Sequence, residues 1–431
     1  MSKNDLVTRR IAFELLRSVV RQKQPFDEAM ARHEDFAVLE KRDRAFVHAL
    51  TAMALRRLGQ IDDLIGRCLK EKQDLKNPVQ DILRVGIAQL VFLGTPAHAA
   101  VDTAVNLAAQ KNHTKPYKGL INAVLRRITR EGEAMLAAQD EDKLCVVPWL
   151  WDAWSQTYGE TITRAIARAH RNEALIDISV KGQPELWAKT LGGELLPTGS
   201  LRLKETVSVK ELDGFKGGAW WVQDAAAALP VTVMGDVKGK LVYDLCAAPG
   251  GKAMQLASKG ARVIAVDRSA KRLERVEENM ARLGLAVEVQ CCDALKLKPE
   301  ERADIVLLDA PCSATGTLRR HPDVPYIKGP EDIARLCDLQ EKLLDHAAEH
   351  IVKEGGMLVY AVCSLQAEEA EDQIERFLKR HNSFVRQPIS REELSGLDEC
   401  LTPTGDIRCL PCHWADKGGM DGFFVARMRC V

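Results

Sequence analysis

The stretch Asp244-Leu-Cys-Ala-Ala-Pro-Gly-Gly-Lys252 lies between an apolar segment, 241–243, and a segment with helical character, 253–258. A buried strand, a tight turn and a helix form the first half of a nucleotide-binding α/β unit. Glycines let the backbone approach a ligand closely, and a helix N-terminus offers unpaired N–H groups. The two glycines do not match the dinucleotide-binding pattern G-x-G-x-x-G. The kind of nucleotide-binding unit therefore has to be inferred from the segments that follow.

Four more short apolar segments follow, and each ends in polar or reactive residues. They are 263–266 before Asp267, 287–290 before Cys292-Asp293, 304–308 before Asp309-Ala-Pro-Cys312, and 357–362 before Cys363-Ser364. With helical segments between most of them, this regularity predicts one doubly wound, Rossmann-like α/β sheet. Such sheets bind ligands at the carboxyl ends of their strands, and an acid that closes the second strand usually binds ribose hydroxyls.

The rest of the chain differs in pattern from this sheet. Residues 5–130 show repeated helical periodicity with short polar joints, which predicts a compact all-α bundle. We expect a domain at 1–130, a linker with a small α+β module at 131–220, and the large α/β domain at 221–431.

The net charge of zero hides an asymmetry between the front of the chain and the rest. Residues 1–130 contain 23 Lys and Arg against 14 Asp and Glu, and the remainder contains 38 against 47. A basic front part is typical of a protein that binds a polyanion such as RNA. An ordinary solvated helical surface would also explain the excess, so the charge alone leaves both interpretations open.

The N-terminal ten residues lack the apolar core of a signal peptide, and no apolar run approaches ~18 residues. We therefore expect a cytoplasmic protein without a membrane partner, whose twelve cysteines are reduced thiols. We also expect a monomer.

Cys312 and Cys363 follow the predicted fourth and fifth strands, so both thiols could face one pocket. A thiolate is a strong nucleophile once nearby cations lower its pKa, and Lys252, Arg319 and Arg320 are the candidate cations. Each cysteine could instead be a small buried apolar residue, but two at neighbouring strand ends favour the catalytic interpretation. A carboxyl group at Asp309 could hydrogen-bond the ring nitrogen and amino group of a pyrimidine.

A second cysteine motif, Cys409-Leu-Pro-Cys412-His413, matches the C-x-x-C-H pattern of haem attachment. Haem attachment of that kind needs export, and a zinc site needs a second ligand pair at matched spacing. We expect a loop before the final strand, without a metal.

Three motifs together resemble the RNA cytosine-5 methyltransferases that use S-adenosylmethionine. They are Asp244 to Lys252, Asp309-Ala-Pro-Cys312 and Val362-Cys363-Ser364. The segment Lys118-Gly-Leu-Ile-Asn-Ala-Val-Leu-Arg-Arg127 resembles a signature of the NusB-like RNA-binding bundle found in members that act on ribosomal RNA. The resemblance spans nearly the whole chain and is weakest across 155–220. It implies a NusB-like bundle, a small α+β module and a Rossmann-like methyltransferase domain.

The resemblance also implies roles for individual residues. Cys363 matches the nucleophile that attacks carbon 6 of the target cytosine, after which carbon 5 takes the methyl group. Cys312 matches the cysteine that assists product release, and Asp309 matches the acid between cofactor and base. The implied cofactor-binding residues are Cys246, Ala247, Ala248, Pro249, Gly250, Gly251, Lys252, Asp267 for the ribose, Arg272, Asp293 on the adenine side, and Asp309.

The sequence departs from the family pattern in three places. Val362 stands where Thr is common, Glu369-Ala370-Glu371 stands where Glu-Asn-Glu is common, and 176–180 replaces an RNA-holding Arg-Val-Asn-like strand. These departures concern RNA positioning rather than the chemistry. The implied substrate is a single-stranded or flipped cytosine of small-subunit ribosomal RNA, held by the basic bundle and the loop 313–330. A tRNA cytosine is the alternative substrate, and a non-catalytic RNA-binding assembly factor is the alternative function.

Overall fold

The computed structural model describes residues 3–69, 75–204, 208–394 and 396–431. The chain forms two compact units. The first, which we call the helical unit, comprises Met1–Asn172 and Leu318–Gly329. The second, the sheet unit, comprises Glu173–Thr317 and Pro330–Val431. The three-part division expected from the sequence stays a prediction about domain limits.

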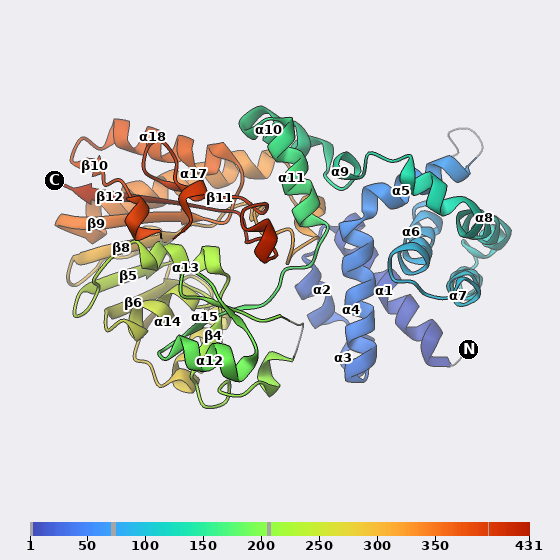
Figure 1. The fold of residues 1–431 in the computed structure, drawn as a ribbon, viewed down its shortest axis with the longest axis horizontal. Helices are drawn as coiled ribbons and strands as arrows, with labels where there is room; N and C mark the ends of the chain where they lie inside the picture. Colours follow the sequence, from blue (N-terminus) through green and yellow to red (C-terminus); the bar gives the residue numbers. More distant parts are fainter. Residues whose placement is uncertain (1–2, 70–74, 205–207, 395) are drawn as a thin grey trace. The chain divides into compact units, whose positions relative to one another are not determined.

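The helical unit confirms the all-α bundle predicted from periodicity (Figure 1). Its longer helices are α1 Lys3–Gln22, α4 Lys41–Arg56, α5 Leu58–Cys68, α6 Asn77–Ile87, α7 Ala97–Ala109, α8 Lys118–Ala137, α10 Pro148–Tyr158 and α11 Glu160–His170. Their apolar faces meet in one core that includes Leu15, Leu50 and Leu83, all fully buried. Because α8 continues to Ala137, the first residues of the expected linker and module at 131–220 are a continuation of this helix.

The segment Leu318–Gly329 belongs to the helical unit although residues of the sheet unit precede and follow it in sequence. It contains the short helix α16, Val324–Ile327. The Tyr326 hydroxyl donates to the Leu55 carbonyl at 2.9 Å, and the Phe26 amide donates to the Asp323 carboxylate at 2.9 Å. Arg319 is only 2% exposed, so the second half of the predicted polar loop 313–330 is packed structure rather than a free loop.

A small antiparallel sheet opens the sheet unit, with the strand order β2-β3-β1-β4. The strands are β1 Asp177–Val180, β2 Glu194–Leu195, β3 Leu201–Arg202 and β4 Trp220–Val222, and helix α12 is Pro184–Leu191. Arg202 binds both carboxylate oxygens of Asp177 at 2.7 Å, and both side chains are buried. Asp177, in the segment 176–180, therefore has a structural partner.

The large sheet has the order β10-β12-β9-β8-β5-β6-β7, with β11 paired to β12. Its strands are β5 Leu241–Leu245, β6 Arg262–Asp267, β7 Glu288–Cys291, β8 Ala303–Asp309, β9 Val352–Val362, β10 Phe384–Arg386, β11 Ile407–Cys409 and β12 Phe423–Cys430. Strands β5 to β9 pair in parallel, whereas β10, β11 and β12 pair antiparallel. The predicted doubly wound sheet is confirmed, and the short strands β10 and β11 are additions that the sequence did not indicate.

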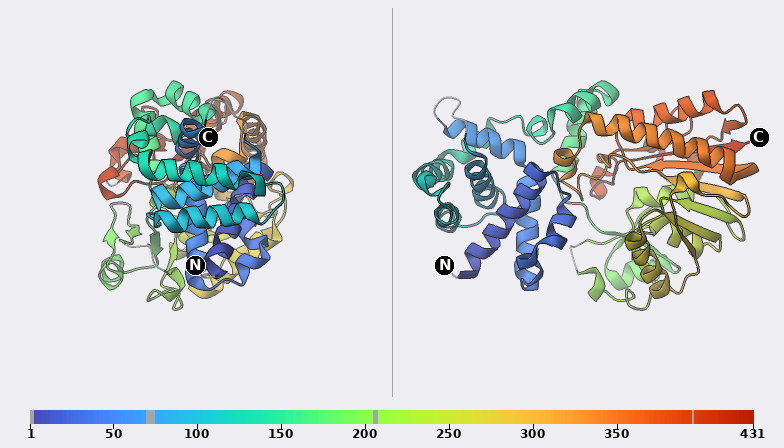
Figure 2. Two further views of the ribbon diagram at one scale, coloured as in Figure 1. Left: turned by 90° about the vertical axis from the view of Figure 1, so that its right-hand side faces the viewer. Right: turned by 180° about the vertical axis from the view of Figure 1, so that it is seen from behind.

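Helices cover both faces of this sheet (Figures 1 and 2). On one face lie α13 Ala225–Thr232, α14 Gly251–Ser258 and α15 Ala270–Leu283, and on the other lie α17 Pro330–His346 and α18 Glu371–Arg380. Alternate residues of each strand enter the two cores, as Val242 and Tyr243 do in β5. Because β6 and β8 flank β5, the loops after β5 and β8 lie at the switch point where such sheets bind ligands.

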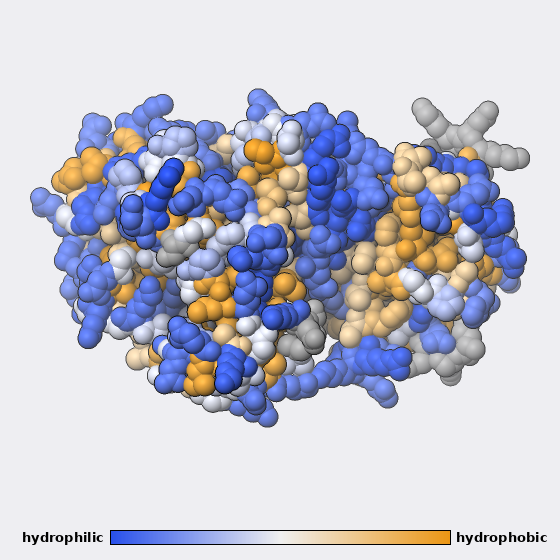
Figure 3. Space-filling model, viewed as in Figure 1, coloured by the Kyte–Doolittle hydropathy of each residue, from blue (hydrophilic) through white to orange (hydrophobic). Residues whose placement is uncertain are grey.

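Hydrophilic residues cover most of the face seen in Figure 3, and hydrophobic residues show between them on both units. None of the helices in the described ranges is long and apolar enough to span a membrane.

Candidate active site

The turn after β5 has a backbone that few residues can adopt. Cys246 has a φ of 63°, the Ala248–Pro249 peptide bond is cis, and Gly250 has a φ of 100°. A Cβ atom on Gly250 would stand 3.2 Å from the Val276 side chain, so glycine fits both the dihedral angle and the space. Helix α14 begins at the next residue, Gly251. The expected strand, turn and helix start are therefore present.

Asp267, at the end of β6, joins this turn to the next loop. Its carboxylate accepts hydrogen bonds from the amides of Ala248 at 3.2 Å and Ser269 at 2.9 Å. Arg272 forms an ion pair with Asp267 at 3.3 Å and also donates to the Ala248 carbonyl. The turn is thus held from outside by two side chains that the sequence assigned to cofactor binding. Asp267 is 4% exposed.

Lys252 and Asp309 form an ion pair between α14 and the end of β8. The ammonium lies 2.7 Å from Asp309 Oδ2, and the lysine side chain is 10% exposed. Burial opposes the charge of Lys252, but Asp309, Asp244 and Cys363 outweigh this and raise the pKa of the ammonium. Lys252 therefore keeps its positive charge beside Asp309 and Cys363.

Cys312 and Cys363 meet at this edge of the sheet. Strands β8 and β9 are parallel neighbours, with Asp309 paired to Ala361, so both cysteines follow at the same level. Their Sγ atoms are 3.5 Å apart, and both residues are partly exposed. The hydrogen bond with Cys363, burial and the charge of Glu369 hold the pKa of Cys312 well above its usual value. Cys312 is therefore the thiol that keeps its proton at neutral pH.

The region between the turn and the two thiols carries an excess of negative charge. Burial and the neighbouring Asp309 raise the pKa of Asp244 to about 8. Burial and the carboxylates of Asp309, Asp267 and Asp244 raise the pKa of the Cys246 thiol to about 12. The carboxylates of Asp309 and Asp267, which contribute to both shifts, stabilise a positive charge placed near them. A cationic ligand such as S-adenosylmethionine, which has a sulfonium and an ammonium group, fits this environment.

Asp293 lies one strand further from the two thiols. It follows β7, next to β6 at the same edge of the sheet, and its exposed carboxylate accepts from the Leu295 amide at 3.1 Å. The structure therefore brings the turn, Asp267, Asp309, Cys312 and Cys363 to one edge, with Asp293 at its periphery.

A buried polar network that the sequence did not indicate lies directly behind the two thiols. Its central group is the fully buried carboxylate of Glu369, bonded to the hydroxyls of Ser313 and Ser364. Two features of the sequence could have indicated this network. Ser313 and Ser364 directly follow the two cysteines, and acidic residues follow Cys363 a few positions later.

The second cysteine motif forms a separate cluster near β11. Cys400 Sγ lies 3.1 Å from His413 Nδ1, and Cys400 and Cys409 are buried. The hydrogen bond with Cys409 and the nearby His413 lower the pKa of Cys400 to about 6. Within the described ranges no group of three or more His, Cys, Asp or Glu side chains is placed to hold a metal ion.

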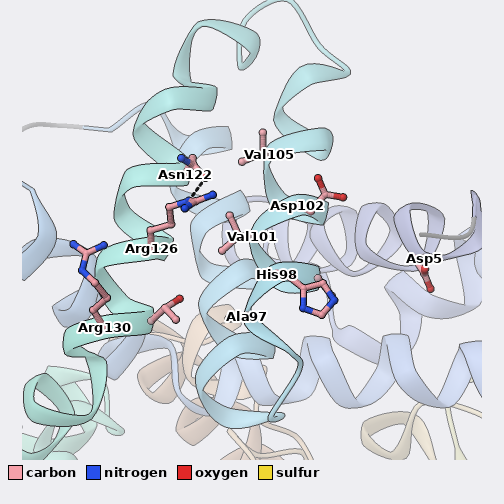
Figure 4. A pocket seen from close by; sticks show the side chains of 11 residues that line it. Asp5, Ala97, His98, Val101, Asp102, Val105, Asn122, Arg126 and Arg130 are labelled. Atoms are coloured by element: carbon pink, nitrogen blue, oxygen red, sulfur yellow. Dashed lines mark hydrogen bonds between the residues drawn. The ribbon is translucent and has the colours of Figure 1, made fainter.

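The helical unit has a groove of about 940 Å³ between α7 and α8 (Figure 4). Arg126 and Arg130 project from α8, Val101 and Val105 lie on the side of α7 nearer to α8, and His98 and Asp102 lie on the other side of α7. Arg126 donates to the Asn122 side chain at 3.1 Å. Two of the three arginines among residues 126–130 thus line a concave surface.

The strand order, the turn and the acid after β6 define the Rossmann-like methyltransferases that use S-adenosylmethionine. Residues 231–429 match the family described as 16S rRNA methyltransferase RsmB/F, and residues 6–130 match the NusB family. Ribosomal RNA small subunit methyltransferase B of Erwinia tasmaniensis is 34% identical over 441 residues, covering 97% of both chains. The probable enzyme of the same name from Synechocystis is 32% identical over 448 residues, covering 98% of this chain and 99% of the relative. The chain belongs to the ribosomal RNA small subunit methyltransferase B family.

Solved structures agree with this assignment. The crystal structure of PH0851 has a TM-score of 0.74 and 25% identity, and the match covers 99% of both chains. NSun6 from Pyrococcus horikoshii with SFG has a TM-score of 0.57 and 19% identity, covering 66% of this chain and 98% of the other, and so shares the fold. The protein is a methyltransferase with S-adenosylmethionine as its cofactor.

Proposed function

We propose that the protein methylates carbon 5 of a cytosine in 16S ribosomal RNA through a covalent bond between the base and Cys363. One observation carries this proposal: two partly exposed thiols stand 3.5 Å apart beside the Lys252–Asp309 ion pair. Carbon 5 of cytosine is a weak nucleophile. Addition of a thiolate to carbon 6 increases its electron density, and such covalent catalysis divides one difficult step into easier ones.

The first step needs a thiolate at Cys363 and stabilised charge on the base. Lys252 stabilises the negative charge of the thiolate, and the thiol of Cys312 can donate to it. The Cys363 sulfur forms a bond to carbon 6, and the electron pair of the 5,6 double bond becomes available at carbon 5. Asp309 accepts a hydrogen bond from the amino group of the base and orients the ring.

The second step removes the proton from carbon 5 and breaks the bond between Cys363 and carbon 6. Once the Cys363 sulfur is bonded to carbon, it carries no negative charge, so the largest cause of the raised Cys312 pKa is gone. Cys312 can then lose its proton to water and, as a thiolate, take the proton from carbon 5. The electrons of that bond restore the 5,6 double bond and expel the Cys363 thiolate. The enzyme returns to its starting protonation state with one proton released.

The cofactor would supply an electrophilic methyl group at the negatively charged edge of the sheet. We propose that Asp267 binds the ribose hydroxyls of the cofactor and that Asp293 lies on its adenine side. Asp309 lies between the cofactor and the target base. Residues 246–252 and Arg272 shape the turn against which it lies. A variant Asp267→Asn keeps the shape but loses charge, so we expect weaker binding of S-adenosylmethionine in calorimetry. Unchanged binding would contradict this assignment.

We propose that the groove between α7 and α8 binds the RNA backbone through Arg126 and Arg130. The target cytosine must be single-stranded or flipped, because carbon 6 of a stacked base is out of reach of a thiolate. The double variant Arg126→Ala with Arg130→Ala should weaken RNA binding and reduce the dependence of log Kd on log salt by about 1–2. Arg32→Ala, at another exposed site of the same unit, is the matched control. Equal salt dependence in both variants would contradict an RNA contact here.

The substrate itself is tested by mapping RNA modifications with and without the gene. We expect a 5-methylcytosine in 16S ribosomal RNA that disappears on deletion and returns with the wild-type gene. Loss of a tRNA methylation instead would support the alternative substrate. Because ribosomal RNA is the substrate, we propose the cytoplasm as the site of action. The monomeric state stays a prediction.

A further inference from the structure

A buried network joins the two thiol-bearing loops from behind. Ser313, directly after Cys312, donates its amide at 2.9 Å and its hydroxyl at 2.5 Å to the Glu369 carboxylate. Ser364, directly after Cys363, donates its hydroxyl to the same carboxylate at 2.5 Å. One side chain therefore accepts hydrogen bonds from both loops, although they come from different strands.

Further contacts hold this carboxylate in place. Gln340 of α17 donates one side-chain amide to both Glu369, at 3.0 Å, and the Pro311 carbonyl, at 2.9 Å. The Tyr360 hydroxyl donates to the Glu369 backbone carbonyl at 2.7 Å. Glu369, Ser313 and Ser364 are all fully buried, so none of these hydrogen bonds competes with water. In such an environment each lost partner leaves an unsatisfied polar group, which makes the arrangement stiff.

The two loops also contact each other directly. The Ser313 and Ser364 hydroxyls are 3.1 Å apart, and Thr315 lies within 3.3 Å of both. The Gly316 amide donates to the Cys363 carbonyl at 3.0 Å. The two thiols are thus presented by loops whose separation is fixed by side chains that never reach the substrate.

We propose that Glu369 is a positioning residue that sets the separation of Cys312 from Cys363, and that it thereby controls release of the methylated RNA. This inference rests on the proposed two-cysteine reaction. Cofactor binding and RNA binding use other residues, so they do not depend on Glu369. Formation of the adduct needs Cys363 alone, whereas its resolution needs Cys312 beside the modified carbon. Displacement of a reacting group by about 1 Å can cost 100-fold in rate.

The test compares Glu369→Gln with Glu368→Gln, whose carboxylate is the exposed neighbour of the buried one. Wild type and Cys312→Ala are measured in parallel, because an active wild type and an adduct in Cys312→Ala establish the two-cysteine reaction independently. For Glu369→Gln we expect an unchanged Kd for S-adenosylmethionine, an unchanged KM for RNA and a kcat at least about tenfold lower. We also expect a covalent RNA adduct that persists in denaturing gels. Glu368→Gln should behave as wild type.

A second variant keeps the inference testable if Glu369→Gln does not fold. Ser313→Ala removes one hydroxyl and leaves the carboxylate, and it should prolong the adduct to a smaller extent. A bifunctional thiol reagent followed by peptide mapping gives a direct readout of geometry, since it should cross-link 312 to 363 more slowly in both variants. Wild-type adduct lifetime and cross-linking in a folded Glu369→Gln or Ser313→Ala protein would overturn the proposal, whereas absence of any adduct in Cys312→Ala would instead overturn the proposed reaction.

Discussion

Two pairs of neighbouring cysteines in the sheet unit differ in almost everything except their proximity. In the strand-end pair, Cys312 and Cys363, both residues are partly exposed. In the hairpin pair, Cys400 and Cys409, the residues are 1% and 0% exposed. Each pair has one thiol with a pKa well above its usual value, Cys312 in the first and Cys409 in the second. Each therefore has one partner that keeps a proton.

The difference shows that an acidic thiol is not sufficient for catalysis. Cys400 has its pKa lowered to about 6, by Cys409 and His413, yet it lies in an interior where no RNA base can reach it. The strand-end pair is accessible, stands at the switch point of the sheet and has the Lys252–Asp309 ion pair beside it. Access and a neighbouring cofactor site distinguish a nucleophile from a structural thiolate.

The largest expected effect is that of removing the proposed nucleophile. Cys363→Ala should lower RNA methylation by at least about 1,000-fold, because the proposed bond to carbon 6 is formed by the Cys363 sulfur. Cys400→Ala should stay within a few-fold of wild type, measured as transfer of labelled methyl groups to RNA. A larger loss of RNA methylation in Cys400→Ala than in Cys363→Ala would contradict this prediction.

Removing the second strand-end thiol should affect turnover rather than attack. Cys312→Ala should lower steady-state turnover by about 100-fold, in the range expected for loss of a general base, while a first methyl transfer per enzyme remains. An experiment with one equivalent of RNA measures the first methyl transfer separately from steady-state turnover. Cys409→Ala also removes a thiol that keeps its proton. It should turn over as the wild type does and should not stop after a first methyl transfer.

The ion pair of Lys252 with Asp309 distinguishes the surroundings of the strand-end cysteines from those of the hairpin pair. Lys252→Gln should lower kcat by about 10-fold to 100-fold, since the thiolate of Cys363 and the carboxylate of Asp309 both lose their cation. Lys259→Gln, on the same side of the sheet unit at the end of α14, is the control. Equal activity of the two variants would show that the ion pair has no part in the reaction.

The smallest effect concerns stability and belongs to the hairpin pair. The pKa of Cys400 is lowered in the folded protein, so its contribution to stability is full above the pKa of an unfolded thiol and is lost as pH falls toward 6. Urea unfolding of wild type should show about 1–2 kcal/mol more stability at pH 8.5 than at pH 6 from this group. Cys400→Ala should remove that part of the slope, and an unchanged slope would mean that Cys400 is a neutral thiol.

Local pattern and periodicity were sufficient to predict much of this molecule. The parallel strands, the turn at Gly250 and the acids after the strands follow from features a few residues long. The convergence of Cys312 with Cys363 could be inferred as well, because parallel neighbours end at one edge of a sheet.

Long-range packing explains what the sequence did not reveal. The segment Leu318–Gly329 has the composition of a polar loop, but Asp323 and Tyr326 have partners at Phe26 and Leu55, almost three hundred residues away. The role of Glu369 depends on hydrogen bonds to Ser313 and Ser364, and neither spacing nor residue type announces that these side chains meet. The strands β10 and β11 are only three residues long, too short for a periodic signal.

The bond between enzyme and RNA can be observed directly in Cys312→Ala incubated with 16S ribosomal RNA and S-adenosylmethionine. After protease and nuclease digestion, mass spectrometry should find a methylated cytidine attached to the peptide that contains Cys363. Attachment to any other cysteine, Cys400 included, or a variant that turns over without an adduct, would contradict the two-cysteine reaction.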